Sequence, residues 1–346
     1  MEFSTIGNTG VEISRIGLGT WAIGGWMWGG TDEKESIRTI QSAFDRGITL
    51  IDTAPVYGFG RSEEIVGKAL AEGGLRHKAV LATKVGLDWR GAQPIRDASP
   101  RRIFKEIDAS LKRLKTDVID IYQVHWPDPA TPIEETAEAM GTLFKQGKIR
   151  AIGVSNFSPE QMIRFSKVAP IHTAQPPYNL FERSIEGDVL PHCWWYGIST
   201  LVYGSICRGL LSGRMNAQTV FGGDDLRRTD PKFQQPRYGQ YLDAVERLDR
   251  FAREKFGKRV IHLALRWVLD RAGVSAALWG ARRPDQLDPV EEVMGWHLTR
   301  EEREQVVRIT EAAVVDPVGP EFMAPPARTL DLQHDAPASR RVHADG

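Results

Sequence analysis

The chain has 346 residues, 41% hydrophobic and 26% charged, with 45 lysines and arginines matched by 45 aspartates and glutamates. Such a chain can bury roughly three quarters of its unfolded surface, so we expect a globular, enzyme-sized core. The even charge balance, without a basic stripe, excludes the electrostatic signature of a nucleic-acid-binding protein.

No secretory leader or membrane span is indicated by the sequence. The first ten residues, MEFSTIGNTG, lack the layout of a signal peptide, and no run of about 18 apolar residues occurs. Cys193 and Cys207 are the only cysteines and fit no CxxC or CxxxxH spacing, so neither a disulfide framework nor a metal site is expected. We therefore expect a cytoplasmic protein without a metal. No feature indicates an oligomeric state.

The chain begins with a predicted β-hairpin over residues 2–14. A strand from Ile16 then ends at Gly19-Thr20-Trp21 and enters a glycine-rich loop that holds Trp26 and Trp28. We interpret these tryptophans as a stacking wall. Packing of Trp26 and Trp28 over the hairpin is an equal alternative.

From residue 32 onward, short apolar strands alternate with amphipathic helices. Helices are predicted over 32–46, 62–71 with Ser62 as N-cap, 99–114, 240–256, 259–269 and 299–311. The strands that follow the first one are predicted to finish at Asp52, Lys84, His125, Ser155-Asn156, Gln175, Tyr203 and Gly280.

Eight such strands, counted from Ile16, close naturally into a single α/β domain, a (β/α)8 TIM barrel over residues 1–326. An open doubly wound sheet is disfavoured because Gly17-Leu18-Gly19 does not continue into a GxGxxG fingerprint. Barrel enzymes build their sites where the strands end, so the polar residues there should surround one mouth.

Two segments fall outside the repeat. Residues 204–239 form a long loop after the seventh strand, which indicates a functional or mobile connection. Residues 327–346 form a polar tail spotted with proline, and we expect its last fifteen or so residues to be disordered.

The segment Gly47 to Gly67 supplies an acid and a phenol to the predicted mouth, Asp52 and Tyr57. If Lys84 and His125 converge on them, the lysine cation would lower the pKa of the phenol and Asp52 would hold the lysine. His125 could then bind and orient a substrate oxygen. Such a set exchanges a proton with an oxygen atom.

The set lacks a carbon nucleophile and a metal, so a cofactor must supply the other reactant, and a hydride carrier is the natural complement. Tyr203 could stack on a nicotinamide, and Ser155, Asn156 and Gln175 could bind its carboxamide. Gly19, Thr20, Trp21 and Gly204 adjoin the same mouth and are further candidates for cofactor contact.

Other functions use the same residues. Lys84 at a strand end could form a Schiff base, as in an aldolase-like lyase. A cofactor-sensing regulatory subunit with little turnover is a third hypothesis. The five histidines without ligand spacing are interpreted as structural or surface residues, with His262 in the core: His77, His172, His192, His262 and His297.

Over residues 3–325 the chain resembles the aldo-keto reductase superfamily. The resemblance lies in Asp52-Thr53-Ala54 followed by Tyr57-Gly58, in SLKRLKTDVIDIYQVHWPD (110–128), and in IGVSNF (152–157). QVHWPD, GTWAIGGWMWGG and YGSICRGLLSGR are similar to the bacterial general-stress and sugar-handling branches.

The resemblance implies that Tyr57 is the general acid in reduction, supported by Lys84 and Asp52, and that His125 positions the carbonyl. It implies that the pyrophosphate of a nicotinamide cofactor is cradled by Ser205, Arg208, Leu210, Ser212, Gly213 and Arg214. It also implies that Gly280, Ala281, Arg282 and Gln286 surround the adenosine ribose.

One segment departs from the family pattern: Asp288-Pro289-Val290 stands where an acid is usually followed by asparagine. Arg282 and Arg283 could fork a 2′-phosphate, so NADP(H) is favoured over NAD(H). The substrate is expected to be a small aldehyde, ketone or sugar. Its pocket would be lined by part of the 204–239 loop and by Trp21, Trp26, Trp28, Trp89 and Trp126.

Overall fold

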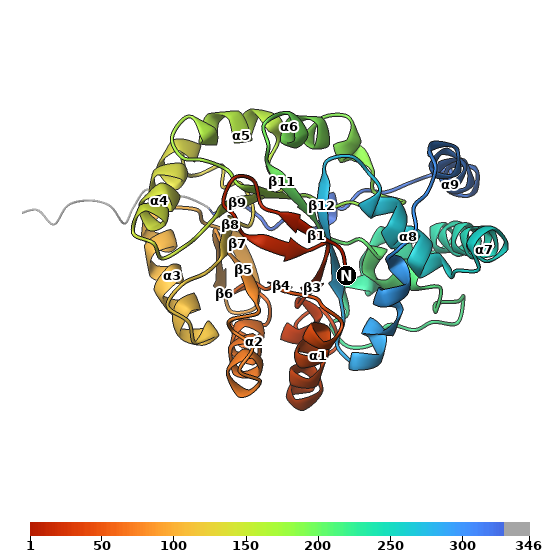
Figure 1. The fold of residues 1–346 in the computed structure, drawn as a ribbon, viewed down its shortest axis with the longest axis horizontal. Helices are drawn as coiled ribbons and strands as arrows, with labels where there is room; N and C mark the ends of the chain where they lie inside the picture. The colour runs from red at the N-terminus through yellow and green to blue at the C-terminus, as the bar shows by residue number, and fades with distance from the viewer. Residues whose placement is uncertain (329–346) are drawn as a thin grey trace, which may run out of the picture.

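The computed structural model describes residues 1–328 and contains a closed barrel of parallel strands surrounded by helices (Figure 1). The strand order is β10-β11-β12-β3-β4-β5-β8-β9. The predicted (β/α)8 barrel is therefore confirmed. The barrel strands are β3 (Ile16–Gly19), β4 (Leu50–Asp52), β5 (Val80–Val85), β8 (Ile121–Val124), β9 (Ile152–Ser155), β10 (Thr173–Gln175), β11 (Ser199–Val202) and β12 (Val274–Gly280).

The helices pack their apolar faces on the outside of the barrel. In α3, Ile103, Ile107 and Leu114 follow the helical spacing and are buried against the strands. The side chains of Asp32, Ser99 and Thr299 cap their helices. The helices are α1 (Glu33–Asp45), α2 (Arg61–Glu72), α3 (Pro100–Leu114), α4 (Ile133–Lys145), α5 (Pro159–Ser166), α6 (Val189–Trp195), α7 (Arg237–Phe256), α8 (Val260–Leu269) and α9 (Arg300–Ala313).

The predicted N-cap of α2 is wrong. The helix begins at Arg61 after Gly60, whose φ of 103° lies in the left-handed region that glycine tolerates. Ser62 lies inside the helix, fully buried, and its hydroxyl bonds the hydroxyls of Thr20 and Thr53 at 2.8 and 2.9 Å. Ser62 therefore joins α2 to the ends of β3 and β4 beside the mouth.

Two hairpins flank the barrel. The predicted N-terminal one, β1 (Phe3–Thr5) with β2 (Glu12–Ser14), packs Ile6 and Ile13 against the interior residues of the strands and closes one end. A second hairpin, β6 (Leu87–Arg90) with β7 (Gln93–Arg96), follows β5 and was not predicted. Leu87-Asp88-Trp89-Arg90 alternates between apolar and polar residues over only four positions, and its partner contains Pro94, which disfavours a strand.

The long loop over 204–239 contains three short 3-10 helices, η3 (Cys207–Ser212), η4 (Leu226–Arg228) and η5 (Pro231–Phe233). A network of buried ion pairs joins residues within this loop and links the loop to Glu182. Arg208 bonds Glu182 at 2.7 Å and also Asp230, while Lys232 bonds the same oxygen of Glu182 at 2.8 Å. Because both cations and both acids are buried, each charge is compensated within the network.

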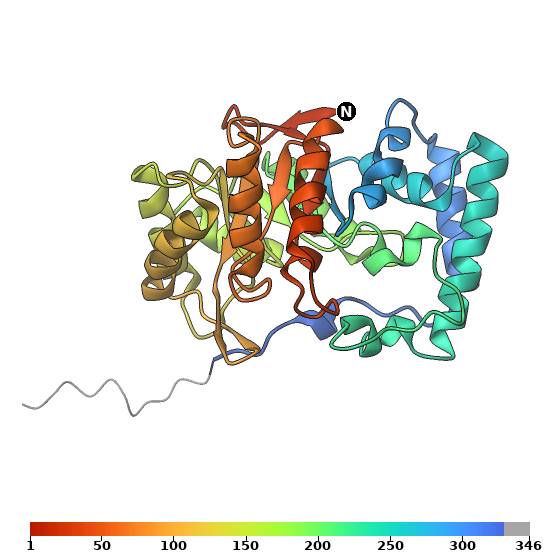
Figure 2. The same ribbon diagram turned by 90° about the horizontal axis from the view of Figure 1, so that it is seen from below.

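The C-terminal segment crosses the barrel at the end opposite the N-terminal hairpin (Figure 2). We call residues 319–328 the strap. Arg96 Nε donates to the carbonyl of Pro325 at 2.6 Å, and Arg328 donates to the Thr131 hydroxyl at 2.8 Å. The rest of the predicted tail, 329–346, lies outside the described residues. Within 1–328, no helix has the length and apolar character needed to cross a membrane.

Candidate active site

Lys84 occupies the centre of the mouth and is fully buried. Its Nζ donates to Asp52 Oδ1 at 2.6 Å, to the carbonyl of Thr53 at 3.0 Å and to the phenol oxygen of Tyr57 at 3.3 Å. Burial lowers the pKa of Lys84, and the negative charge of Asp52 opposes that shift. Three of the four residues predicted to converge therefore share one hydrogen-bonded group.

The second carboxylate oxygen of Asp52 also has partners. Gln175 Nε2 donates to Oδ2 at 2.8 Å, and Gln123 Nε2 does so at 3.3 Å. Gln123 was not predicted, because it lies within an apolar strand and reads as part of the core. Together the two glutamines fix the carboxylate so that Oδ1 faces Lys84.

His125 is the fourth member, and its ring meets the Tyr57 ring edge-on at a centroid separation of 5.8 Å. Burial, and then the positive charge of Lys84, hold the pKa of His125 well below its usual range. The imidazole is therefore neutral at pH 7, and one ring N–H is available to donate.

The predicted lowering of the Tyr57 pKa is wrong for this structure. Burial raises the pKa of the phenol well above its usual range, and the charge of Asp52 raises it further. Desolvation of the phenolate is the larger of the two causes. The phenol is consequently protonated at neutral pH, which suits a proton donor.

Aromatic contacts set the orientation of Tyr57. The Trp21 ring stacks on it with a centroid separation of 5.9 Å and an angle of 22°, and Trp28 meets Trp21 edge-on at 5.5 Å. The loop after β3 therefore forms a wall beside the phenol, as the sequence indicated for Trp21.

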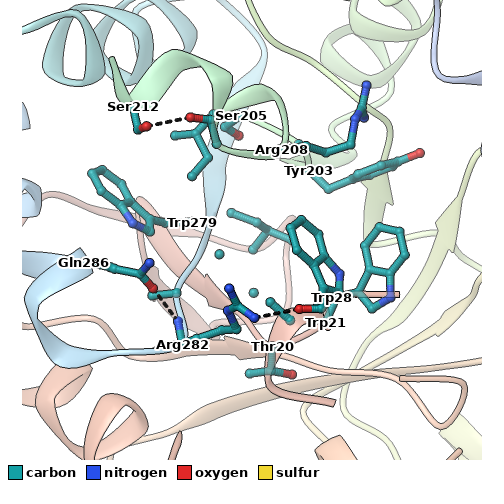
Figure 3. Close-up of a pocket in the computed structure, with 18 of the residues that line it drawn as sticks. Thr20, Trp21, Trp28, Tyr203, Ser205, Arg208, Ser212, Trp279, Arg282 and Gln286 are labelled. Atoms are coloured by element: carbon teal, nitrogen blue, oxygen red, sulfur yellow. Dashed lines mark hydrogen bonds between the residues drawn. The ribbon is translucent and has the colours of Figure 1, made fainter. Parts of the chain in front are cut away.

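A cavity of about 340 Å³ runs from Tyr57 to the outer end of β12 (Figure 3). Most of the residues predicted to contact a cofactor line it: Gly19, Thr20, Trp21, Gln175, Tyr203, Gly204, Ser205, Arg208, Ser212, Arg214, Gly280, Ala281, Arg282 and Gln286. Leu210 and Gly213 do not belong to this lining. Leu210 is buried in the core, and Gly213 lies against Val260.

The outer part of this cavity is rich in arginine. Arg282 Nη1 donates to the carbonyl of Trp28 at 2.7 Å, and Gln286 accepts from the Arg282 backbone N–H at 2.7 Å (Figure 3). Arg283 bonds Asp285 at 3.1 Å. Six arginines line the cavity: Arg208, Arg214, Arg227, Arg259, Arg282 and Arg283. The Arg208 guanidinium is bonded to Glu182 and Asp230, and the other five suit an elongated polyanion.

Two tryptophans on this cavity carry unpaired indole N–H groups. In the described part of the chain, Nε1 of Trp21 and Nε1 of Trp28 are buried without a hydrogen-bond partner. A buried donor without a partner is costly, and a bound acceptor is one way to satisfy it. Both the arginine set and these donors fit a phosphate-bearing cofactor.

A second cavity of about 260 Å³ adjoins the first at Tyr57 and Tyr203. His125, Ser155 and Asn156 line it. Asn156 Nδ2 donates to the His125 carbonyl at 3.0 Å and its Oδ1 accepts from the Tyr203 hydroxyl at 2.9 Å, while the Ser155 hydroxyl donates to the Gln175 carbonyl at 2.8 Å. These bonds tie the ends of β8, β9, β10 and β11 together.

The tryptophans divide between the two cavities. Trp21, Trp26 and Trp126 line the second one as predicted, whereas Trp28 lines only the first. Trp89 lines neither. It lies on β6, 5.6 Å from the ring of Phe59 and beneath the guanidinium of Arg102. The strap contributes Phe322, Met323 and Pro325, which precede the predicted polar tail and were not predicted to line a pocket.

Comparisons with known proteins identify relatives that match nearly the whole chain. The model of the aldo/keto reductase family matches residues 15–311. The chain is 62% identical over 328 residues to aldo-keto reductase YhdN of Bacillus subtilis, covering 95% of this chain and 99% of that protein. It is 37% identical over 302 residues to the NADH-specific methylglyoxal reductase of Escherichia coli, covering 83% and 91%. The structure of glycerol dehydrogenase AKR11B4 from Gluconobacter oxydans superposes with a TM-score of 0.84 at 53% identity, covering 93% and 99%.

Proposed function

The chain belongs to the aldo-keto reductase family of NAD(P)H-dependent oxidoreductases, and we propose that Tyr57 is its proton donor in the reduction of a small carbonyl compound. The observation that carries this role is the position of Lys84 Nζ, 2.6 Å from Asp52 and 3.3 Å from the Tyr57 phenol. This group lies where the two cavities meet.

The residues of the first cavity fit a nicotinamide cofactor, which when bound supplies a hydride to the carbonyl carbon. Tyr203 and Gln175 line both cavities and offer a ring face and an amide to the nicotinamide end. Ser155 and Asn156 offer polar groups to it from the adjoining second cavity. The arginines suit the phosphates, and Ser205, Ser212 and Arg214 adjoin them on the same cavity.

The side chains where the two cavities meet supply the proton and orient the substrate oxygen. The Tyr57 phenol gives its proton to the carbonyl oxygen, and the O–H bond breaks as the new alcohol forms. Lys84 then stabilises the phenolate that remains, while neutral His125 donates its N–H to the same substrate oxygen and orients it. Asp52 holds Lys84 and does not touch the substrate.

We also propose a preference for NADP(H) over NAD(H). The support is the arginine-rich outer end of the cavity, where Arg282 and Arg283 adjoin each other on the loop after β12. Guanidinium groups bind phosphate in paired geometry, which suits a 2′-phosphate. The Escherichia coli relative is named as NADH-specific, so the two cofactors differ across the family.

The other two hypotheses receive less support. A Schiff base needs a free, neutral lysine, whereas Lys84 is bonded to three acceptors. The relatives above are named as reductases and a dehydrogenase. Cys193 and Cys207 are buried free thiols, which supports our proposal of a cytoplasmic location.

The test is NADPH binding by fluorescence titration together with steady-state turnover over a panel of aldehydes, ketones and sugars. The proposal predicts saturable binding and substrate-dependent oxidation of NADPH. Tight binding without turnover on any member of the panel would instead support the regulatory subunit.

A further inference from the structure

The second cavity, which we call the substrate cavity, has walls without formal charge. Among residues 1–328, no lysine, arginine, aspartate or glutamate lines it. Its polar groups are neutral amides, hydroxyls and the uncharged imidazole of His125. The remaining walls are aromatic or aliphatic, formed by Trp21, Trp26, Met27, Val56, Leu87, Pro94, Trp126, Phe322, Met323 and Pro325.

Three cations that contact lining residues of this cavity are already bound to other groups. Lys84 is bonded to Asp52, and Arg208 is bonded to Glu182 and Asp230. Arg96 has its guanidinium 5.9 Å from the Trp126 ring, but it donates to the carbonyls of Pro325 and Pro127. None of these groups can turn to a substrate without breaking a contact that holds the site together.

The two cavities therefore differ in charge although they share Tyr57 and Tyr203. Six arginines and Asp52 line the first cavity, whereas the walls of the substrate cavity carry no charge in the described part of the chain. An anion in the substrate cavity would lose its hydration without gaining a cation, which is unfavourable. The electron-rich faces of the aromatic walls would add repulsion.

We propose that the substrate cavity accepts uncharged carbonyl compounds and rejects those that carry a carboxylate or phosphate group. The proposal rests on the reductase function proposed above and names the class of substrate that the site takes. Neutral aldehydes, ketones and polyol-derived carbonyls fit the cavity. Keto acids and sugar phosphates do not.

A matched pair of substrates tests this proposal: para-carboxybenzaldehyde and its methyl ester. The acid is ionised at pH 7 and is the smaller of the two, so exclusion by size would favour it. We expect kcat/KM for the acid to be roughly 100-fold below that for the ester, because an unpaired carboxylate must be desolvated. Glyceraldehyde and its phosphate ester should differ in the same direction.

Values of kcat/KM for acid and ester within about threefold of each other would overturn the proposal while leaving the reductase function intact. Failure to reduce any of these aldehydes would overturn the reductase function and the proposal with it. The two failures are therefore distinguishable.

A positive charge introduced at the edge of the substrate cavity tests whether the lack of charge in its walls causes the selection against anions. Thr229 lines the substrate cavity and is exposed, so a lysine there can reach both the cavity and water. Thr229→Lys should raise the acid-to-ester ratio of kcat/KM about tenfold, and Thr229→Gln, of similar reach but neutral, should not. Equal ratios in the two variants would show that the charge of the wall does not govern selection.

Discussion

Gly24 and Gly58 are in backbone contact across the mouth of the barrel. A β-carbon on Gly24 would lie 2.6 Å from the carbonyl carbon and oxygen of Tyr57, and one on Gly58 would lie 2.1 Å from the carbonyl oxygen of Gly24. Both distances are far inside van der Waals contact. The loop that carries Trp21 can therefore press on the loop that carries Tyr57 only because neither glycine has a side chain.

This contact predicts the effect of Gly24→Ala. The new methyl group must push the Tyr57 backbone away, and a shift of about 1 Å in a catalytic group can cost roughly 100-fold in rate. We expect kcat to fall about 10- to 100-fold while far-UV circular dichroism stays unchanged. Gly222→Ala is the control, because no heavy atom of the described residues lies within 4 Å of a β-carbon there. A wild-type kcat in Gly24→Ala would show that the contact between Gly24 and Tyr57 does not position the Tyr57 side chain.

Arg282 is expected to distinguish the two cofactors. If its guanidinium binds a 2′-phosphate, Arg282→Ala should raise the Kd for NADPH about 10- to 100-fold and the Kd for NADH by less than about threefold. Arg300→Ala, on exposed α9 outside both cavities, is the control. Fluorescence titration measures both constants. An equal change for NADPH and NADH would assign Arg282 to the shared part of the cofactor.

The stability of the fold should fall as the pH drops from 7 to 5. His262 lies buried at the start of α8, where its Nδ1 accepts from the Arg259 N–H at 3.2 Å, and burial lowers its pKa to about 4. Because the unfolded chain binds this proton below pH 6.5 and the folded chain does so only near pH 4, acid favours unfolding. The loss at pH 5 should be about 1 to 2 kcal/mol.

Urea unfolding at pH 7 and pH 5 measures this loss. His262→Gln keeps an acceptor for the Arg259 N–H but cannot titrate, so its free energy of unfolding should depend less on pH than that of the wild type. His77→Gln, at an exposed position, should leave the pH dependence unchanged. If His262→Gln shows the same slope as the wild type, His262 is not the group responsible.

Much of the barrel could be predicted from the sequence because its signals are local. Most barrel strands are short apolar runs, and Asp52, Lys84 and His125 lie at or directly after the ends of three of them. The geometry of a closed parallel barrel brings such residues to one mouth. His262 was also expected in the core, and it is buried.

The features that were missed depend on contacts between distant segments. In the sequence, Gln123 is a single polar residue within an apolar strand. Its role becomes visible only in the fold, where its side chain donates to the carboxylate of Asp52. The network of Arg208 and Glu182 joins residues 26 positions apart, and the strap joins residues more than 200 positions from the β6–β7 hairpin. The pKa of Tyr57 was predicted in the wrong direction because a sequence indicates a neighbouring charge but not the depth of burial.

The proposed role of Tyr57 as proton donor is tested by the turnover of Tyr57→Phe with NADPH and a neutral aldehyde. We expect kcat to fall about 10³-fold while the Kd for NADPH stays within about threefold of the wild-type value. Tyr196→Phe, at an exposed position, should keep wild-type turnover. Turnover of Tyr57→Phe within about threefold of wild type would contradict the account.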